Sequence, residues 1–350
     1  MVDKIIQEDT ESIINSIGSD FKKIAGKTFL ITGANGFIAS YLVDTLLRLN
    51  EALLKENPVH LILSVHHKVT RNSRLGHCLK NKRIKFVVGD IVQKNLPKKI
   101  DVIIHAASKA SPKEYLSQLV ETADVNVLGT KKLLEYSAKE KVSKFVLISS
   151  GEIYGNPDPQ NIPIPETYNG NVDPIGPRAT YQESKRFSET LCYLYWKARR
   201  VDTVIVRLFH TYGPRLSLND GRVVPEFIRR ALMNEKIELI DGGKAIRAFS
   251  YISDSIAGIF KVLLHGQSGQ AYNVGSEEEI NMKDLAEKII RLTSSKSKVQ
   301  IVPGAAIAHS IATPDRNTPS TKKLAKLGYK NKISLEKGLS RLIAWYQNQK

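Results

Sequence analysis

A glycine turn between an apolar strand and a helix constrains this chain more than any other feature. Residues 27–32 form an apolar run typical of a buried parallel strand, and residues 40–49 place leucines on one face of a predicted helix. Between them lies the pattern Gly33-x-x-Gly36-x-x-Ala39. Glycines let the backbone turn tightly and approach a pyrophosphate, whose charge is stabilised by the free amides at a helix N-terminus. We therefore predict a dinucleotide site at this turn, with contacts from Gly33, Asn35, Gly36, Phe37 and Ile38.

Further apolar runs follow the turn, and helical or polar segments separate them. They lie at residues 59–65, 85–91, 101–108, 145–148 and 203–208. Strands that alternate with helices in this order predict a Rossmann-type, doubly wound parallel sheet in the α/β class. We predict an N-terminal helical extension over residues 1–25 and a dinucleotide-binding domain with the catalytic residues over 26–214. A smaller substrate lobe should cover 215–350, with some chain crossing between the lobes.

The composition excludes several classes of protein. The hydrophobic fraction of 42% permits a full core, but no stretch approaches the roughly 20 apolar residues of a membrane span. The polar first 20 residues are unlike a signal peptide, so we expect a soluble, cytoplasmic protein. Cys78 and Cys192 lack the spacing of metal ligands, and we interpret both as free thiols with no metal site.

The net charge of +17 is spread along the whole chain. The basic residues do not form a continuous block in one arm of the chain, and no recognised nucleic-acid motif is present. We therefore do not predict a nucleic-acid partner. An anionic substrate such as a nucleoside diphosphate sugar fits the charge, and so does simple solubility.

Basic residues follow the second predicted strand, where an NAD site typically has an acid that binds the ribose hydroxyls. His66, His67, Lys68, Arg71 and Arg74 stand there instead. They suit an additional phosphate, so we favour NADP(H) over NAD(H), with a solvated basic loop as the alternative. The further cofactor contacts that we predict are His66, Arg71, Asp90, Ile91, Ala106, Ala107, Ser108 and Asn126.

A hydroxyl, a carboxylate, a phenol and an ammonium group form the predicted catalytic set. Ser150 and Glu152 lie just past the strand at 145–148, where ligands bind in open parallel sheets. Tyr181 and Lys185 are four residues apart and share one helical face. The ammonium should lower the phenol's pKa from about 10 toward neutrality, so that Tyr181 can exchange a proton with a sugar hydroxyl. A packed tyrosine beside a solvated lysine is the alternative.

With these residues, the chain resembles the extended short-chain dehydrogenase/reductases of the nucleotide-sugar epimerase/dehydratase family over residues 26–345, most of all the UDP-glucuronate decarboxylases. The matching segments are residues 105–112, 171–178, 181–186, 219–224 and 247–249. The resemblance implies that Tyr181 and Lys185 are the catalytic pair and also touch the cofactor. It further implies hydride exchange at C4 of a hexose and a homodimer built through two helices per subunit. The substrate contacts that we predict are Ser111, Arg178, His210, Arg215, Arg222 and Arg247.

Three departures from the decarboxylase pattern determine our first choice of reaction. Gly151 replaces a hydroxyl residue, His210 replaces an asparagine, and the basic loop suits a cofactor drawn fresh at each turnover. We therefore predict first an NAD(P)H-dependent reductase of a dTDP-4-dehydro-6-deoxyhexose in surface-polysaccharide biosynthesis, including the O-antigen of lipopolysaccharide. The alternative is a UDP-glucuronate decarboxylase with retained NAD that makes UDP-xylose, followed by a 4-epimerase or 4,6-dehydratase.

Overall fold

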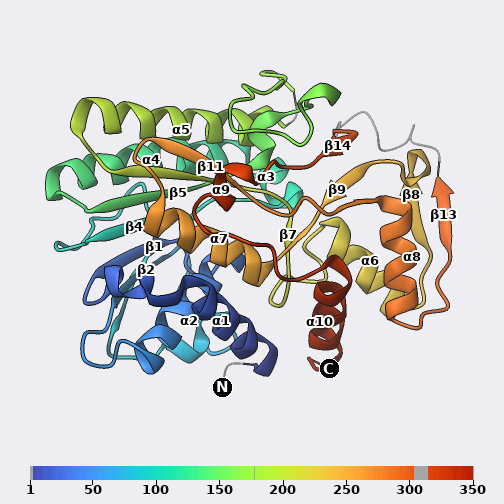
Figure 1. The fold of residues 1–350 in the computed structure, drawn as a ribbon, viewed down its shortest axis with the longest axis horizontal. Helices are drawn as coiled ribbons and strands as arrows, with labels where there is room; N and C mark the ends of the chain where they lie inside the picture. The colour runs from blue at the N-terminus through green and yellow to red at the C-terminus, as the bar shows by residue number, and fades with distance from the viewer. Residues whose placement is uncertain (1–2, 177, 303–313, 350) are drawn as a thin grey trace.

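The protein is built around one parallel sheet. The computed structural model describes residues 3–176, 178–302 and 314–349, so Pro177 of the matching segment 171–178 lies outside the described residues (Figure 1). All seven strands of the sheet run parallel. Their spatial order is β11 (Gln270–Val274), β6 (Thr203–Leu208), β5 (Lys144–Ser150), β4 (Val102–His105), β1 (Thr28–Thr32), β2 (His60–Val65) and β3 (Ile84–Val88). This order confirms the predicted doubly wound α/β fold.

Helices cover both faces of the sheet (Figure 1). α4 (Leu119–Glu140) and α5 (Ala179–Arg199) pack against each other on one face, while α2 (Phe37–Ala52) and α7 (Ile252–His265) cover the other. The strand order reverses between β1 and β4, so the loops after these strands diverge and leave a crevice for a ligand. Central residues such as Phe29 and Ile31 of β1 are fully buried, which holds the ends of the strands in fixed positions.

The N-terminal segment packs on the main domain. The N-terminal segment predicted to be helical contains an α-helix, α1 (Lys4–Ile17), followed by the 3₁₀ helix η1 (Gly18–Ile24). The apolar stripe that includes Ile6, Ile13 and Ile17 is buried against α2 and α7. The amphipathic pattern of the segment therefore serves packing.

A smaller group of elements from the second half of the chain lies beside the sheet (Figure 1). Its helices are α6 (Val223–Leu232), α8 (Met282–Leu292) and α10 (Leu335–Gln347), whereas the short α9 (Lys322–Ala325) packs on β11 and α7 of the main domain. The strands of the smaller group are β7 (Thr211–Tyr212), β8 (Ile237–Ile240), β9 (Ile246–Ala248), β10 (Ser250–Tyr251), β12 (Glu279–Asn281), β13 (Val299–Val302) and β14 (Arg316–Asn317). The boundary near residue 214 stays a proposal. Beyond it, the chain returns to the main sheet as β11.

Candidate active site

The glycine turn is pressed against the end of β4. Gly33 has a left-handed φ of 63°, and a Cβ there would lie 2.7 Å from Cα of Ala107. A Cβ on Gly36 would lie 2.9 Å from the Gly33 carbonyl oxygen. Gly36 precedes the first turn of α2, and no side chain caps that helix. The first amides of α2 are therefore available to an anionic group, as a bound pyrophosphate requires.

Two buried polar atoms support a cofactor in this crevice. Ser108 Oγ, beyond β4, and Asn126 Oδ1, on α4, have no hydrogen-bond partner among the described residues. Such atoms are costly unless a ligand or water satisfies them. The Asn126 side chain is fixed, because its Nδ2 donates to Ser184 Oγ at 2.9 Å. A bound NAD(P) would offer hydrogen-bond partners to both atoms, so these residues fit a dinucleotide.

The structure separates the basic residues after β2 into two groups. His66, His67, Lys68 and Arg71 are exposed. Arg74 points inward instead, and donates from Nη1 to the Asn35 carbonyl at 3.2 Å and from Nε to the Arg215 carbonyl at 3.1 Å. Contact of the exposed residues with the cofactor stays a prediction, whereas the guanidinium of Arg74 bonds to the backbone.

The other predicted cofactor contacts belong to the same region. Asp90 accepts the Val92 amide at 2.9 Å in the turn after β3, and Ile91 is buried. The Ala107 amide donates to Thr32 Oγ1 at 3.1 Å, which ties the loop of Ala106 and Ala107 to the end of β1.

The predicted catalytic residues meet where β5 ends and α5 begins. Ser150 closes β5, and its hydroxyl accepts the Glu152 amide at 3.1 Å. Tyr181 lies in the first turn of α5, is 6% exposed and forms a hydrogen bond with Ser150. Lys185 follows one turn later and donates from Nζ to the Ile148 carbonyl at 2.9 Å. The arrangement brings a hydroxyl donor, a phenol and an ammonium group to one end of β5.

The predicted effect of Lys185 on Tyr181 was wrong. Burial raises the pKa of Tyr181 to about 12, and the group that lowers it most is Ser150 through its hydrogen bond. Burial likewise lowers the pKa of Lys185 to about 8, because a charged ammonium is poorly solvated there. The four-residue spacing predicted the shared helical face but did not predict the cost of burying both charged forms.

Glu152 lies in a positively charged environment. Its carboxylate forms an ion pair with Arg178, at the start of α5. His210 lies close to this pair, and burial lowers its pKa to about 3, assisted by the positive charges of Arg247, Arg178 and Arg222. Arg247 is 8% exposed. Three guanidinium groups from different segments therefore act on the same small region.

Ser111 and Arg215, both predicted substrate contacts, also have partners within the protein. Ser111 caps the short helix α3 (Pro112–Ser117), where its hydroxyl accepts the Glu114 amide at 3.3 Å and donates to the Glu114 carboxylate at 3.0 Å. Arg215 forms an ion pair of 2.6 Å with Asp44 of α2. Its guanidinium is thus directed to the dinucleotide side of the crevice, unlike Arg222 and Arg247.

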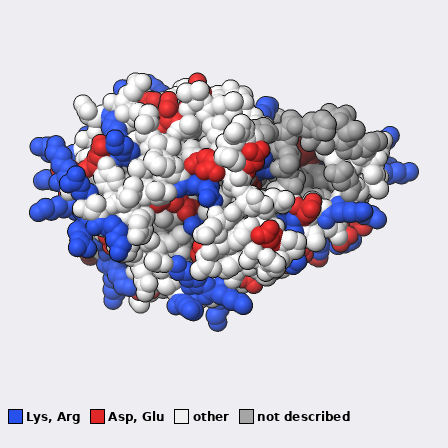
Figure 2. Space-filling view, turned by 90° about the horizontal axis from the view of Figure 1, so that it is seen from above, with Lys and Arg blue, Asp and Glu red and all other residues white. Residues whose placement is uncertain are grey.

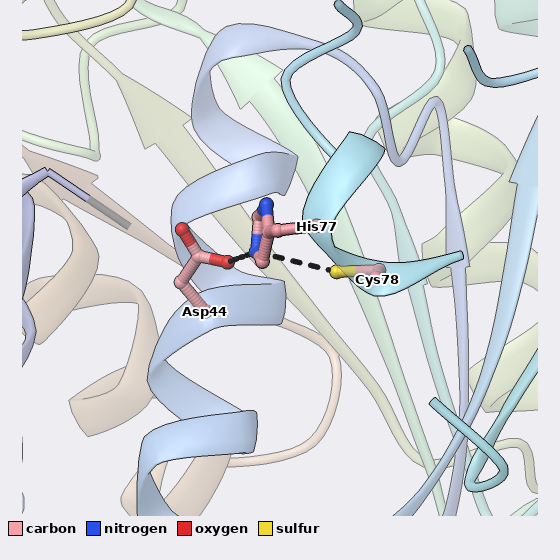
Figure 3. Close-up of side chains that lie close together, drawn as sticks. All are labelled: Asp44, His77 and Cys78. Atoms are coloured by element: carbon pink, nitrogen blue, oxygen red, sulfur yellow. Dashed lines mark hydrogen bonds and ion pairs between the residues drawn. The ribbon is translucent and has the colours of Figure 1, made fainter. Parts of the chain in front are cut away.

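Sequence reasoning did not identify Tyr115 or the cluster of Asp44, His77 and Cys78. Tyr115 stacks on Tyr181 with ring centroids 5.1 Å apart, and no local spacing connects the two residues. Asp44 Oδ1 bonds to His77 Nε2 at 2.8 Å, and Cys78 Sγ lies 3.3 Å from the same nitrogen (Figure 3). These three residues carry potential metal-ligand atoms, although we predicted no metal site. The cluster depends on α2 meeting a distant loop.

Comparison with known proteins identifies the family. The profile of the NAD dependent epimerase/dehydratase family matches residues 29–275. The chain belongs to this family. UDP-glucuronic acid decarboxylase 1 of Danio rerio is 35% identical over 327 residues, which cover 92% of this chain and 73% of the relative. UDP-glucuronic acid decarboxylase 5 of Arabidopsis thaliana is 35% identical over 316 residues, with coverages of 89% and 86%.

Solved structures confirm the fold. UDP-glucuronic acid 4-epimerase from Bacillus cereus, in complex with UDP-glucuronic acid and NAD, has a TM-score of 0.77 and 24% identity, covering 92% of this chain and all of that one (100%). dTDP-glucose 4,6-dehydratase from Bacillus anthracis, in complex with NAD, has a TM-score of 0.78 and 22% identity, with coverages of 93% and 97%.

These findings confirm the resemblance, the enzyme class and the NAD(P) type of cofactor. The chain is an NAD-dependent enzyme that modifies nucleotide sugars. The relatives support the decarboxylase, our alternative, better than the dTDP-4-keto reductase that we predicted first. In addition, no helix in the described part of the chain is both long enough and apolar enough to cross a bilayer.

Proposed function

We propose that the protein decarboxylates UDP-glucuronate. The observation that carries this proposal is that the positive charges of Arg247, Arg178 and Arg222 all act on the buried His210, while Arg178 is paired with Glu152 and Arg222 with Asp220. This positive charge favours a sugar that bears a carboxylate, because arginine binds carboxylates with charge-assisted hydrogen bonds. The decarboxylase relatives support the same reaction.

The catalytic residues suit the proton transfers of this reaction. A bound NAD, held at the turn of Gly33 and Gly36, would supply the acceptor and the later donor of the C4 hydride. Tyr181 takes the proton of the C4 hydroxyl as the ketone forms, and Ser150 donates a hydrogen bond to the oxygen on which negative charge develops. Loss of carbon dioxide from C5 leaves its electron pair in the enolate of this ketone. After solvent supplies a proton to C5 and the hydride is returned to C4, Tyr181 returns its proton to the C4 oxygen and the hydroxyl is restored.

A second candidate is net reduction of a dTDP-4-dehydro-6-deoxyhexose for surface-polysaccharide synthesis. Two observations favour it. The loop after β2 exposes His66 and Arg71 where an NAD site typically has an acid. Decarboxylases resemble one another in a hydroxyl residue at the position of Gly151. A Cβ there would lie 2.9 Å from ring atoms of Phe209, so such a residue would displace the ring.

Two parallel reactions test these candidates. Purified protein is incubated with UDP-glucuronate and NAD, and with dTDP-4-dehydro-6-deoxyglucose and NADPH. We expect carbon dioxide release in the first reaction without net change in cofactor. Tyr181→Phe should abolish this release and leave cofactor binding intact. Stoichiometric consumption of NADPH in the second reaction, with no carbon dioxide in the first, would reject the decarboxylase and establish the reductase.

We also propose that the protein forms a homodimer through α4 and α5. Residues other than Lys, Arg, Asp and Glu cover much of the face seen in Figure 2, which is the side on which α5 lies. Apolar side chains of α4 and α5 are exposed although the two helices pack together, among them Val120 at 70% and Phe187 at 49%. The others are Leu119, Leu128, Tyr193 and Leu194. A second copy would bury this apolar surface.

A further inference from the structure

Arg74 connects the dinucleotide turn to a loop that precedes the substrate pocket. Its guanidinium donates to two backbone carbonyls, those of Asn35 and Arg215, from two different nitrogens. Asn35 is held a second time, because its side-chain oxygen accepts the Leu75 amide at 3.3 Å. The planar fork of an arginine can span two acceptors in this way, whereas the single ammonium of lysine is a point donor.

The loop that contains Arg74 is anchored to α2. Asp44 accepts from His77 through one oxygen and pairs with Arg215 through the other (Figure 3 shows the first contact). Both contacts to His77, from Asp44 and Cys78, fall on the same ring nitrogen, and burial raises the pKa of the Cys78 thiol to about 12. A protonated thiol and a carboxylate already paired with Arg215 favour a hydrogen-bonded anchor over a metal centre.

The Arg215 loop ends at Arg222, whose charge acts on the catalytic residues. Arg222 forms an ion pair of 3.2 Å with Asp220 and immediately precedes α6. Its positive charge lowers the pKa of Tyr181 and of His210, so it lies within electrostatic reach of both. The backbone that Arg74 holds at Arg215 therefore leads to Arg222, whose charge acts on the catalytic phenol.

We propose that Arg74 is a positioning residue that couples binding of the dinucleotide to binding of the nucleotide sugar. A pyrophosphate that orders the turn at Asn35 also fixes the Arg74 fork. The fork in turn fixes the carbonyl of Arg215 and the path of the loop to Arg222. The inference rests on the proposed function only in requiring that both NAD(P) and a UDP- or dTDP-linked compound bind to the chain.

Binding measurements test this coupling without turnover. Affinities for UDP and for dTDP are measured by calorimetry, with and without saturating NADH or NADPH. In the unmodified protein we expect the cofactor to tighten binding of the preferred nucleotide by about fivefold or more, the lower range of typical allosteric coupling. In Arg74→Gln and Arg74→Lys this factor should fall to about one, since neither side chain spans both carbonyls.

A matched control separates the position of Arg74 from its charge. Arg83, on the same connection between β2 and β3, is exposed, and Arg83→Gln should keep the full coupling factor. Thermal melting establishes that each variant is folded. If Arg74→Gln does not fold, Arg74→Lys alone decides the outcome. Coupling that persists in the folded Arg74 variants, or that is absent from the unmodified protein, would overturn the proposal. Because free nucleotides are the probes, a wrong assignment of the sugar reaction leaves this test valid.

Discussion

Ser150 is the residue that most directly controls the reactivity of Tyr181. Its hydrogen bond opposes the burial that raises the pKa of Tyr181 to about 12. Ser150→Ala removes this hydrogen bond, so the pKa rises further and less phenolate is present at any pH below it. We expect kcat to fall about 10²- to 10⁴-fold, the usual contribution of general acid–base catalysis. The pH–rate profile should shift to higher pH.

The neighbouring serine provides the control for this experiment. The side chain of Ser149 points to the opposite side of β5, where its hydroxyl donates to Glu189 at 2.6 Å. Ser149→Ala should leave the position of the pH–rate profile unchanged. If the profile of Ser150→Ala also stays in place, Ser150 does not act through the Tyr181 phenol.

At this scale the sequence predicted which catalytic groups meet, but not their electrostatics. The four-residue spacing of Tyr181 and Lys185 indicates a shared face whatever surrounds the helix. The direction of a pKa shift depends on burial, and burial depends on residues from other segments, such as Tyr115. The ion pair of Glu152 with Arg178 also joins two loops, which no local pattern encodes.

At the scale of elements, the apolar runs predicted the strands of the main sheet up to β6. The exception is β11, which pairs with β6 and is contributed by residues far along the chain. Its pairing is a long-range contact, so the local pattern of residues 270–274 does not reveal that it extends this sheet. The run at residues 101–108 also overestimated the length of β4, which ends at His105.

The exposed faces of α4 and α5 carry the prediction about assembly. A charge placed in an apolar interface must be desolvated on association. We therefore expect Val120→Asp combined with Phe187→Asp to convert the dimer into monomers, as measured by light scattering after size-exclusion chromatography. Met233, which is 59% exposed and follows α6, provides a control, and Met233→Asp should remain dimeric. An unchanged mass for the double variant would place the interface elsewhere.

At the scale of the whole molecule, Asp9 joins the first helix to three distant parts of the chain. Its carboxylate accepts from Tyr41 of α2 at 3.2 Å, from Tyr251 before α7 at 3.0 Å and from Arg341 of α10 at 2.9 Å. Burial raises the pKa of Asp9 from 3.8 to about 6, and Arg341 is the strongest opposing influence. The folded state therefore holds the proton more tightly than the unfolded chain does. The resulting contribution to stability is complete below pH 3.8 and is lost as the pH rises through 6.

Arg341→Met should make this dependence on pH steeper. Without the guanidinium, the pKa of Asp9 moves further above 6, and the buried carboxylate has no cation when it is ionised. We expect the free energy of unfolding in urea to fall by about 3–5 kcal/mol at pH 8, the usual cost of breaking a buried pair, and by less at pH 5, where Asp9 can be protonated. Glu8→Gln removes only the more exposed partner of Arg341 and should cost at most about 1 kcal/mol at either pH. An equal loss at both pH values in Arg341→Met would mean that Arg341 stabilises this junction by packing, and that the charge of Asp9 does not limit the stability of the molecule.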